Sequence, residues 1–284
     1  MTVLTTLAAL RAHRDEHAGA SIGLVPTMGA LHEGHLSLIR RAAAENDVVV
    51  VSIFVNPTQF TDPADLARYP RSLERDTELA ISAGATVIYA PEVESIYPPG
   101  FSTNVHVANA TDLWEGESRP GHFDGVATVV SILLNQVRPD RSYFGEKDFQ
   151  QLAMIQHLQR DLALPGTIVP CPTVREADGL AMSSRNVRLK EAHREVAPYL
   201  HQALTAMADA AQAGDTEALR LAILGAVIVK RSPDIELDYL QIVDAVTLEP
   251  VDLVRPGCRG IIAATIGGVR LIDNLELIPV GFEA

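Results

Sequence analysis

Cysteine and lysine are scarce in this sequence. Its 284 residues include two cysteines, Cys171 and Cys258, which form no C-x-x-C pattern. This argues against a disulfide framework and against a cysteine-ligated zinc site, and it favours a cytoplasmic, reducing setting. Only three lysines, Lys147, Lys190 and Lys230, accompany 20 arginines. The surroundings of each lysine are therefore informative.

Positive charge is also in short supply. The chain carries 23 lysines and arginines against 36 aspartates and glutamates, a formal net charge of −13. A surface this acidic gains no broad counterion-release energy from DNA, RNA or an anionic membrane. We therefore expect no nucleic acid partner, although a local basic site for a small anion remains open.

No apolar run is long enough to cross a bilayer, so we expect no membrane association. The longest runs, Val48–Val55 and Leu221–Val229, fall short of the roughly 20 residues that a spanning helix needs. The first cations follow the N-terminal apolar stretch instead of preceding it, which argues against a signal peptide. The helical spacing of Val3, Leu7 and Leu10 predicts a short amphipathic helix there.

Three common motifs are missing. The chain has no G-x-x-x-x-G-K-[ST] loop, no G-x-G-x-x-G fingerprint and no G-x-S-x-G elbow. These absences weaken the P-loop ATPase, dinucleotide-binding and α/β-hydrolase interpretations.

The first half of the chain alternates between strand and helix patterns. Hydrophobic residues make up 47% of the sequence, which excludes disorder as the main state. The alternation predicts a Rossmann-like α/β fold with a doubly wound parallel sheet. The expected strands are Ile22–Pro26, Asp47–Val55, Thr86–Ala90, Arg141–Phe144 and Thr167–Val169, and the expected helices are Glu33–Glu45, Ser72–Ala83, Val126–Val137 and Asp148–Leu162.

The pattern changes near residue 175. Two expected helices are followed by three expected strands, which indicates a smaller C-terminal α+β domain. These elements are Glu191–Ala213, Thr216–Lys230, Glu236–Val243, Arg259–Ala264 and Val269–Ile272. We expect domains at residues 1–175 and 176–284, in line with roughly 150 residues per domain.

The segment Pro26–His35, PTMGALHEGH, joins the first of these strands to a helix. Its glycines let backbone N–H groups approach a phosphate, and a helix N-terminus favours an anion. His32 and His35 fall on the same side of the first turn and can donate to phosphate oxygens in a transition state. A solvated helix cap is the simpler alternative. Zinc is disfavoured, because the metalloprotease motif places its histidines four residues apart.

Two further segments follow strands, at the edge where doubly wound sheets bind ligands. In SIFVNPTQF, residues 52–60, the asparagine and Gln59 can hydrogen-bond a hydroxyl or carboxylate, although a proline-containing turn also explains the pattern. In YFGEKDFQQ, residues 143–151, Lys147 can neutralise phosphate charge. There, the aspartate after the lysine can simply cap the next helix.

The segment Val174–Asn186, VREADGLAMSSRN, lies at the expected domain boundary, where ligand clefts form. Two hydroxyls followed by Arg185 can grip phosphates, since arginine makes bidentate contacts. A polar linker is the alternative. We expect five other histidines at the surface or in packing: His106, His122, His157, His193 and His201.

Together, PTMGALHEGH, SIFVNPTQF, GEKDFQQ and READGLAMSSRN, in this order and spacing, resemble the pantothenate synthetase (pantoate–β-alanine ligase) family. SRPGHFDGV, around Arg119–Val126, fits as well, and the resemblance covers nearly the whole chain. H-x-G-H alone would indicate only the wider nucleotidyltransferase superfamily. Thr58 departs from the family's NPxQF pattern, which has an apolar residue at that position.

The resemblance implies an ATP- and Mg²⁺-dependent ligase, usually a homodimer, with a smaller C-terminal domain. We expect that domain to act as a lid, because acyl adenylates hydrolyse and water must be kept out. Pantoate is first activated as pantoyl adenylate, with release of pyrophosphate. β-Alanine then attacks the adenylate carbonyl, which gives pantothenate and AMP. The main alternative is an H-x-G-H nucleotidyltransferase that acts on a phosphorylated acceptor, and a catalytically silent nucleotide-binding regulator is a further one.

The resemblance also implies roles for individual residues. His35 is the expected proton donor, with His32, Lys147 and Arg185 as the other catalytic groups, and Gln59 and Gln151 are expected to hold pantoate. No metal ligand can be assigned. The implied ATP-binding residues are Met28, Gly29, Ala30, Leu31, His32, Glu33, Gly34, His35, Gly145, Glu146, Lys147, Asp148, Val174, Met182, Ser183, Ser184 and Arg185.

Overall fold

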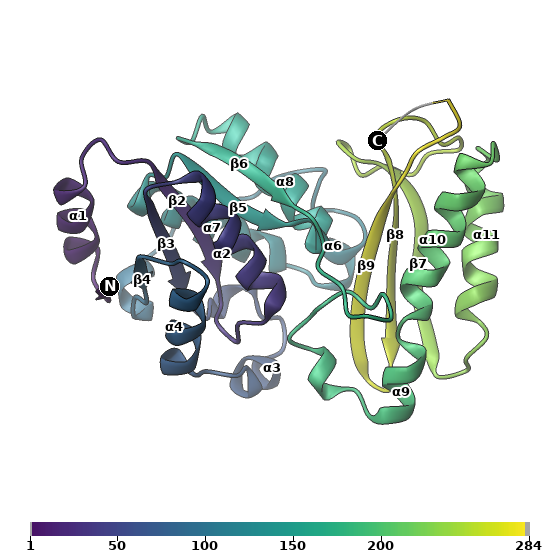
Figure 1. Cartoon of the computed structure of the whole chain (residues 1–284), viewed down its shortest axis with the longest axis horizontal. Helices are drawn as coiled ribbons and strands as arrows, with labels where there is room; N and C mark the ends of the chain where they lie inside the picture. Colours follow the sequence, from purple (N-terminus) through teal and green to yellow (C-terminus); the bar gives the residue numbers. More distant parts are fainter. Residues whose placement is uncertain (1, 282–284) are drawn as a thin grey trace. The chain divides into compact units, whose positions relative to one another are not determined.

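The computed structural model describes residues 2–281, which form two compact units (Figure 1). Among these residues, unit 1 consists of positions 2–146 and Gln150–Pro172, and unit 2 consists of Lys147–Phe149 and positions 173–281. A three-residue segment that contains Lys147 therefore belongs with the C-terminal part of the chain.

Unit 1 is built on a six-stranded parallel sheet with the strand order β1-β4-β3-β2-β5-β6 (Figure 1). The doubly wound α/β fold predicted from the sequence is confirmed. The strands are β1 Thr2–Leu4, β2 Ile22–Thr27, β3 Val48–Ile53, β4 Val87–Tyr89, β5 Arg141–Gly145 and β6 Thr167–Cys171.

Helices flank this sheet and bury both of its faces. Leu24 and Val25 point to opposite faces of β2 because side chains alternate along a strand, and each is 0% exposed. This double burial explains why β3 is apolar at nearly every position. The helices are α1 Leu7–Glu16, α2 Glu33–Glu45, α3 Pro63–Arg68, α4 Leu73–Ser82, α5 Val93–Ile96, α6 Glu115–Ser118, α7 His122–Val137 and α8 Phe149–Asp161, with short 3₁₀ turns at Pro57–Gln59 and Glu146–Asp148.

The register of the central strands determines where the loops of unit 1 begin. β2 pairs in parallel with β3, where Thr27 lies opposite Ile53, and with β5, where Leu24 lies opposite Ser142. The carboxyl ends of these three strands therefore meet at one edge of the sheet. The segments that follow them start side by side at that edge.

Unit 2 contains a three-stranded antiparallel sheet in the order β7-β8-β9, which confirms the expected α+β pattern. Gly267 and Gly268, with φ of +55° and +78°, form the tight turn between β8 and β9. Helices α10 and α11 pack on this sheet around a core that includes Leu204, Met207 and Ile262. The elements are α9 Glu191–Val196, α10 Tyr199–Gln212, α11 Ala218–Val229, β7 Ile235–Asp244, β8 Cys258–Ile266 and β9 Val269–Leu277, with a 3₁₀ turn at Asn186–Arg188.

The structure corrects the prediction at the N-terminus. Val3 belongs to β1, which pairs with β4, and does not extend the helix. The helix begins only at Leu7, because the Thr6 hydroxyl accepts a hydrogen bond from the N–H of Ala9 and caps it there. The spacing of Val3, Leu7 and Leu10 was helical by coincidence.

The expected helix Glu191–Ala213 is in fact two helices. α9 ends at Val196, and α10 begins at Tyr199, directly after Pro198. Proline lacks the N–H that would continue the first helix, so the chain breaks there.

Sequence periodicity also missed three short helices, α3, α5 and α6, because four to six residues are too few for a 3.6-residue pattern. Ser72 stands at the N-cap position of α4, but its side chain makes no capping hydrogen bond.

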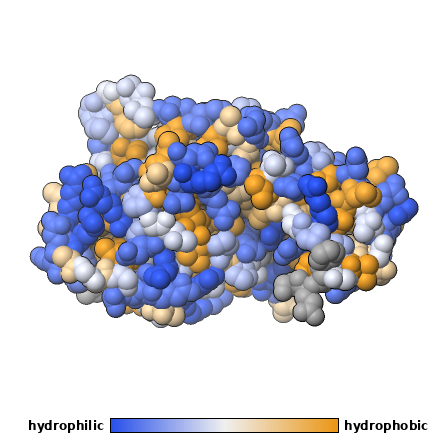
Figure 2. Space-filling view, turned by 90° about the horizontal axis from the view of Figure 1, so that it is seen from above, coloured by the Kyte–Doolittle hydropathy of each residue, from blue (hydrophilic) through white to orange (hydrophobic). Residues whose placement is uncertain are grey.

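Hydrophobic and hydrophilic residues are interspersed over the face drawn in Figure 2. Among residues 2–281, no helix combines the length and the apolar character that a membrane span requires.

The contribution of the unit 1 core to stability can be measured by shortening a buried side chain and following unfolding by tryptophan fluorescence. Leu134 of α7 is 1% exposed, whereas Leu162 is 54% exposed. We expect Leu134→Ala to lower the free energy of unfolding by about 2–5 kcal/mol, and Leu162→Ala by less than about 0.5 kcal/mol. Urea unfolding followed by the fluorescence of Trp114, the single tryptophan, measures both. Equal losses in the two variants would contradict the described packing of α7.

Candidate active site

The loop from β2 to α2 has an uncommon backbone. Gly29 and Ala30 have φ of +80° and +51°, in the left-handed region. Thr27 fixes the start of the loop, because its hydroxyl donates to the Ser52 carbonyl of β3 at 2.7 Å and accepts from the Gly29 N–H at 3.1 Å. The loop is thereby tied to the neighbouring strand.

A buried carboxylate from α4 holds the other side of this loop. Asp76 is 1% exposed, and its two oxygens accept from the backbone N–H groups of Ala30 and Leu31, each at 2.8 Å. A Cβ at Gly29 would come within 2.8 Å of Asp76 Oδ2, so glycine is needed for space as well as for φ. Sequence reasoning missed this role. The available signal was an acid four residues before Ala80 on the buried face of α4, since a buried charge needs partners.

His32 and His35 lie together at the N-terminus of α2, with ring centroids 4.1 Å apart. His32 is the N-cap residue, and its Nδ1 accepts from the Gly34 N–H at 3.2 Å. Nδ1 of His35 accepts from the His32 N–H at 3.4 Å. The histidines therefore do cap the helix. A neutral imidazole that accepts at Nδ1 carries its proton on Nε2, so the cap fixes both rings as Nε2–H donors.

A hydrogen bond from Asn56 fixes the orientation of the Gln59 side-chain amide. Gln59 is 8% exposed, and its Oε1 accepts from Nδ2 of Asn56 at 3.0 Å. Asn56 is itself oriented, because Nδ2 also donates to the Gly125 carbonyl while Oδ1 accepts from the hydroxyls of Tyr97 and Thr58. Nε2 of Gln59 has no partner among the described residues. Gln59 can thus offer N–H groups to a carboxylate or hydroxyl.

His122 and Arg119 hold the backbone of Gln59. Nδ1 of His122 donates to the Gln59 carbonyl at 2.8 Å, and its Nε2 accepts from Arg119 at 3.1 Å. His122 is 6% exposed, which agrees with the expected packing role. It also orients the backbone of Gln59. The available signal for this task is the position of the histidine within the SRPGHFDGV segment.

The two glutamines at the start of α8 differ in their contacts. Gln150 is 9% exposed and is fully engaged, because it accepts from the Glu115 N–H and donates to the carbonyls of Ala110 and Leu113. Gln151 is half-buried and has no recorded partner within residues 2–281. Of this pair, Gln151 is the one that can meet a ligand.

The buried thiols do not provide a nucleophile. Cys171 and Cys258 are both buried, and burial raises the pKa of the Cys171 thiol. A raised pKa keeps a thiol protonated and unreactive at neutral pH. Within the described residues, no group of three or more histidine, cysteine, aspartate or glutamate side chains is placed to hold a metal ion.

Unit 2 contributes Lys147 and the segment Val174–Arg185. The Lys147 side chain is 17% exposed, and its Nζ lies 3.7 Å from Oδ1 of Asp148. Val174 accepts from the N–H of Met182 at 2.9 Å, beside the bridge that pairs Arg175 with Ala181. These contacts fold the segment back on itself.

The turn within this segment is anchored on α9. Asp178 lies 2.5 Å from the Arg194 guanidinium, and this hydrogen bond holds the pKa of Asp178 below its usual range. Beyond the turn, the Ser183 hydroxyl accepts from the Arg185 N–H at 3.2 Å. The Arg185 guanidinium has no partner among the residues that the structure describes, so it can bind an anion.

The structure thus gathers the predicted residues in two sets. In unit 1, the segments that contain Met28–His35, Gln59 and Gly145–Glu146 all begin at the same edge of the parallel sheet, and Gln151 lies in the first turn of α8. In unit 2 lie Lys147, Asp148, Val174, Met182, Ser183, Ser184 and Arg185.

Comparison with known proteins gives one consistent result. The family model for pantoate-beta-alanine ligase matches residues 2–276. A pantothenate synthetase of Moorella thermoacetica is 50% identical over 279 residues, which are 98% of this chain and 99% of that protein.

Solved structures agree with this result. The crystal structure of pantothenate synthetase from Thermus thermophilus matches with a TM-score of 0.92 and 48% identity, over 98% of this chain and 100% of that one. Pantoate-beta-alanine ligase from Francisella tularensis, complexed with beta-gamma ATP and beta-alanine, matches with a TM-score of 0.79 and 36% identity, over 97% of each chain. The chain belongs to the pantoate–β-alanine ligase family, the pantothenate synthetases.

Proposed function

We propose that this chain condenses pantoate with β-alanine through a pantoyl adenylate and releases pyrophosphate and then AMP. Membership of the pantoate–β-alanine ligase family carries the overall reaction, which is the ATP-dependent formation of pantothenate. The family relative from Francisella tularensis binds beta-gamma ATP and beta-alanine. The observation that best supports the adenylation step is that His32 and His35 lie together at the N-terminus of α2 and use their Nδ1 atoms as acceptors in the helix cap, which leaves Nε2 as the donor of each neutral ring.

Adenylation brings two anions together, because the pantoate carboxylate attacks the α-phosphate. The protein must offset this repulsion and stabilise the charge that grows on the phosphoryl oxygens. His35 donates a proton or hydrogen bond to these oxygens, with His32 beside it. Lys147 and Arg185 supply positive charge, and the other ATP contacts come from residues 28–34, 145–148, 174 and 182–184.

Pantoate is held by Gln59 and Gln151. Asn56 occupies Oε1 of Gln59, so this glutamine presents its N–H groups to the carboxylate or hydroxyls of pantoate. Positioning of this kind raises the rate, because a fixed carboxylate reacts as part of a single complex.

Mg²⁺ accompanies ATP in this proposal. Within residues 2–281, no group of three or more histidine, cysteine, aspartate or glutamate side chains is placed to hold a metal ion. The phosphates and water would therefore supply most of the Mg²⁺ ligands, a common arrangement for this ion. The ion would neutralise phosphate charge.

In the second step, the neutral amine of β-alanine attacks the adenylate carbonyl, and AMP leaves. Acyl adenylates hydrolyse, so water must be kept out, and we propose that residues 176–284 act as the lid. We further propose that the enzyme is a cytoplasmic homodimer. The alternative of nucleotidyl transfer to a phosphorylated acceptor is not favoured, because the family match covers residues 2–276.

Omitting each substrate in turn tests the reaction. We expect AMP only when ATP, pantoate and β-alanine are all present, and pyrophosphate when ATP and pantoate are present without the amine. Separating the nucleotides by chromatography measures both products. AMP formation that does not depend on an amine would contradict the proposal.

Removing the proposed phosphate ligands should slow the first step. We expect His35→Ala and Lys147→Ala each to lower the rate of adenylate formation at least ~10²-fold, as the loss of a preorganised oxyanion donor does. Rapid-quench measurement of pyrophosphate release tests this. Lys190→Ala, at an exposed lysine of unit 2, is the matched control and should keep the normal rate. Normal pyrophosphate release in either active-site variant would remove that residue from the mechanism.

The direction of the Gln59 amide can be tested separately. Asn56→Asp has nearly the same shape but cannot donate to Oε1 of Gln59, so the glutamine loses its fixed orientation. We expect both Asn56→Asp and Gln59→Ala to weaken pantoate binding about 10- to 100-fold, with ATP binding unchanged. Isothermal titration with each substrate gives both affinities. Unchanged pantoate affinity in Gln59→Ala would refute its assignment.

A further inference from the structure

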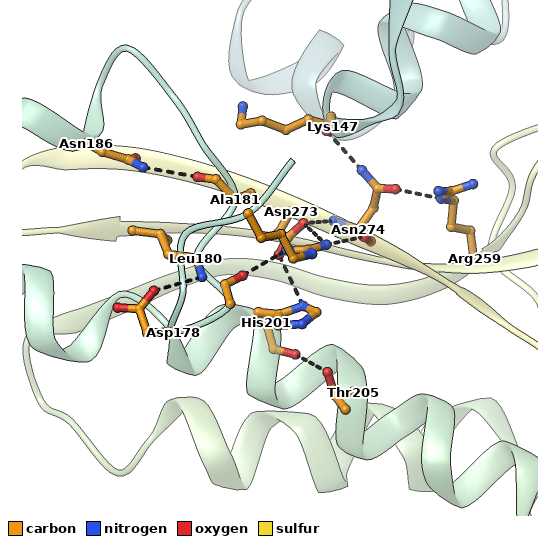
Figure 3. Close-up of polar contacts among 12 residues, drawn as sticks. Lys147, Asp178, Leu180, Ala181, Asn186, His201, Thr205, Arg259, Asp273 and Asn274 are labelled. Atoms are coloured by element: carbon orange, nitrogen blue, oxygen red, sulfur yellow. Dashed lines mark hydrogen bonds and ion pairs between the residues drawn. The ribbon is translucent and has the colours of Figure 1, made fainter. Parts of the chain in front are cut away.

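A buried amide of β9 holds the backbone at Lys147. Asn274 is 3% exposed, and its Nδ2 donates to the Lys147 carbonyl at 2.9 Å (Figure 3). Its Oδ1 accepts from Nε of Arg259, in β8, at 2.6 Å. Because a guanidinium can only donate, this contact fixes the direction of the amide and leaves Nδ2 as the donor to Lys147. Both residues lie in unit 2 with Lys147.

Arg259 holds the same turn at a second point. Its guanidinium carbon lies 4.2 Å from the centre of the Phe149 ring, within the range of a cation–π contact. The turn Lys147–Phe149 is therefore held by its first carbonyl and by its last side chain, and both contacts converge on Arg259 and Asn274.

The strand that carries Asn274 is itself held by buried polar contacts. The adjacent Asp273 is 4% exposed and forms a bidentate ion pair with Arg175, at 2.6 and 3.0 Å. Oδ1 of Asp273 also accepts from the backbone N–H of Asn274 at 2.8 Å. The amide that binds Lys147 thus projects from a backbone that a buried ion pair keeps in place.

The Lys147 side chain extends away from the carbonyl that Asn274 binds (Figure 3). A lysine ammonium sits on a long stem with several rotatable bonds, so its precision depends on how well the backbone is placed. Small displacements of a positioned charge cause large losses in rate.

We propose that Asn274 is a positioning residue for adenylation, which, together with Arg259, holds the Lys147 backbone so that the ammonium group meets the phosphates of ATP. The inference rests on the proposed role of Lys147 as a phosphate ligand. Asn274 touches no substrate in this scheme and acts only through the lysine.

Two variants remove the contact in different ways. Asn274→Asp can still accept from Arg259 but has no N–H for the Lys147 carbonyl, and Asn274→Ala removes both bonds. We expect each to slow single-turnover pyrophosphate release about 10-fold, the effect of a lost buried hydrogen bond. Pantoate affinity and the reaction of preformed pantoyl adenylate with β-alanine should stay normal, because in this proposal Lys147 acts on the phosphates that leave as pyrophosphate before the amine attacks.

A third variant approaches the same contact from the other side. Arg259→Lys keeps the positive charge but loses the Nε–H that orients Asn274, so it should reproduce the slow adenylation. Asp238→Asn, which removes an ion pair with Arg270 in the same sheet, is the matched control and should release pyrophosphate at the normal rate. Thermal melting of each variant establishes that it is folded.

A double-mutant cycle separates this inference from the proposed function. Lys147→Ala combined with Asn274→Ala should be no slower than Lys147→Ala alone, since Asn274 acts through the lysine. Multiplying losses, slowed amide formation from the preformed adenylate, or normal adenylation in the Asn274 variants beside a slow Lys147→Ala would overturn the positioning role. Normal adenylation in Lys147→Ala would instead overturn the assignment of the lysine itself, and the inference with it.

Discussion

The parallel pairing of β2 with β3 and β5 is the constraint on which the unit 1 part of the candidate site depends. Parallel strands end at the same edge of a sheet, so the segments after Thr27, Ile53 and Gly145 must start beside one another. Buried polar contacts then hold the first two of these segments, through Asp76 for the first and through Asn56 and His122 for the second. Gln150, in the third segment, bonds in turn to the chain around Glu115. The sheet brings the segments close together, and the buried contacts orient their side chains and backbone.

Direction matters because amides and imidazoles have two different ends. In the helix cap, Nδ1 of His32 and Nδ1 of His35 each accept a hydrogen bond from a backbone N–H. A neutral ring that accepts at Nδ1 carries its proton on Nε2. In the same way, the hydrogen bond from Asn56 to Oε1 of Gln59 fixes which end of the amide is the acceptor and which is the donor. Such groups need no reorganisation when a ligand arrives, and preorganised donors are the ones that stabilise a transition state most effectively.

Much of the fold could be predicted from the sequence, because periodicity and turn residues are local signals. The doubly wound sheet was predictable from runs such as Val48–Val55, and the α+β part from the change of pattern near residue 175. The candidate segments could be singled out by their order and spacing. What could not be predicted depends on contacts between distant residues. Asp76 binds a loop 45 and 46 positions away, and Asn274 binds a carbonyl 127 positions away. At Val3 the local signal was misleading. The spacing of Val3, Leu7 and Leu10 predicted a helix, but Val3 pairs with β4 instead.

The chain passes between the two units three times, after Glu146, after Phe149 and after Pro172. The units are therefore not separable by a single cut. A fragment that begins at Thr173 would lack Lys147–Phe149, and the amide of Asn274 would lose the carbonyl that it binds. The face of Arg259 would likewise lose the Phe149 ring. The C-terminal part is thus a discontinuous compact unit, because three of its residues lie in the sequence between two segments of the other unit.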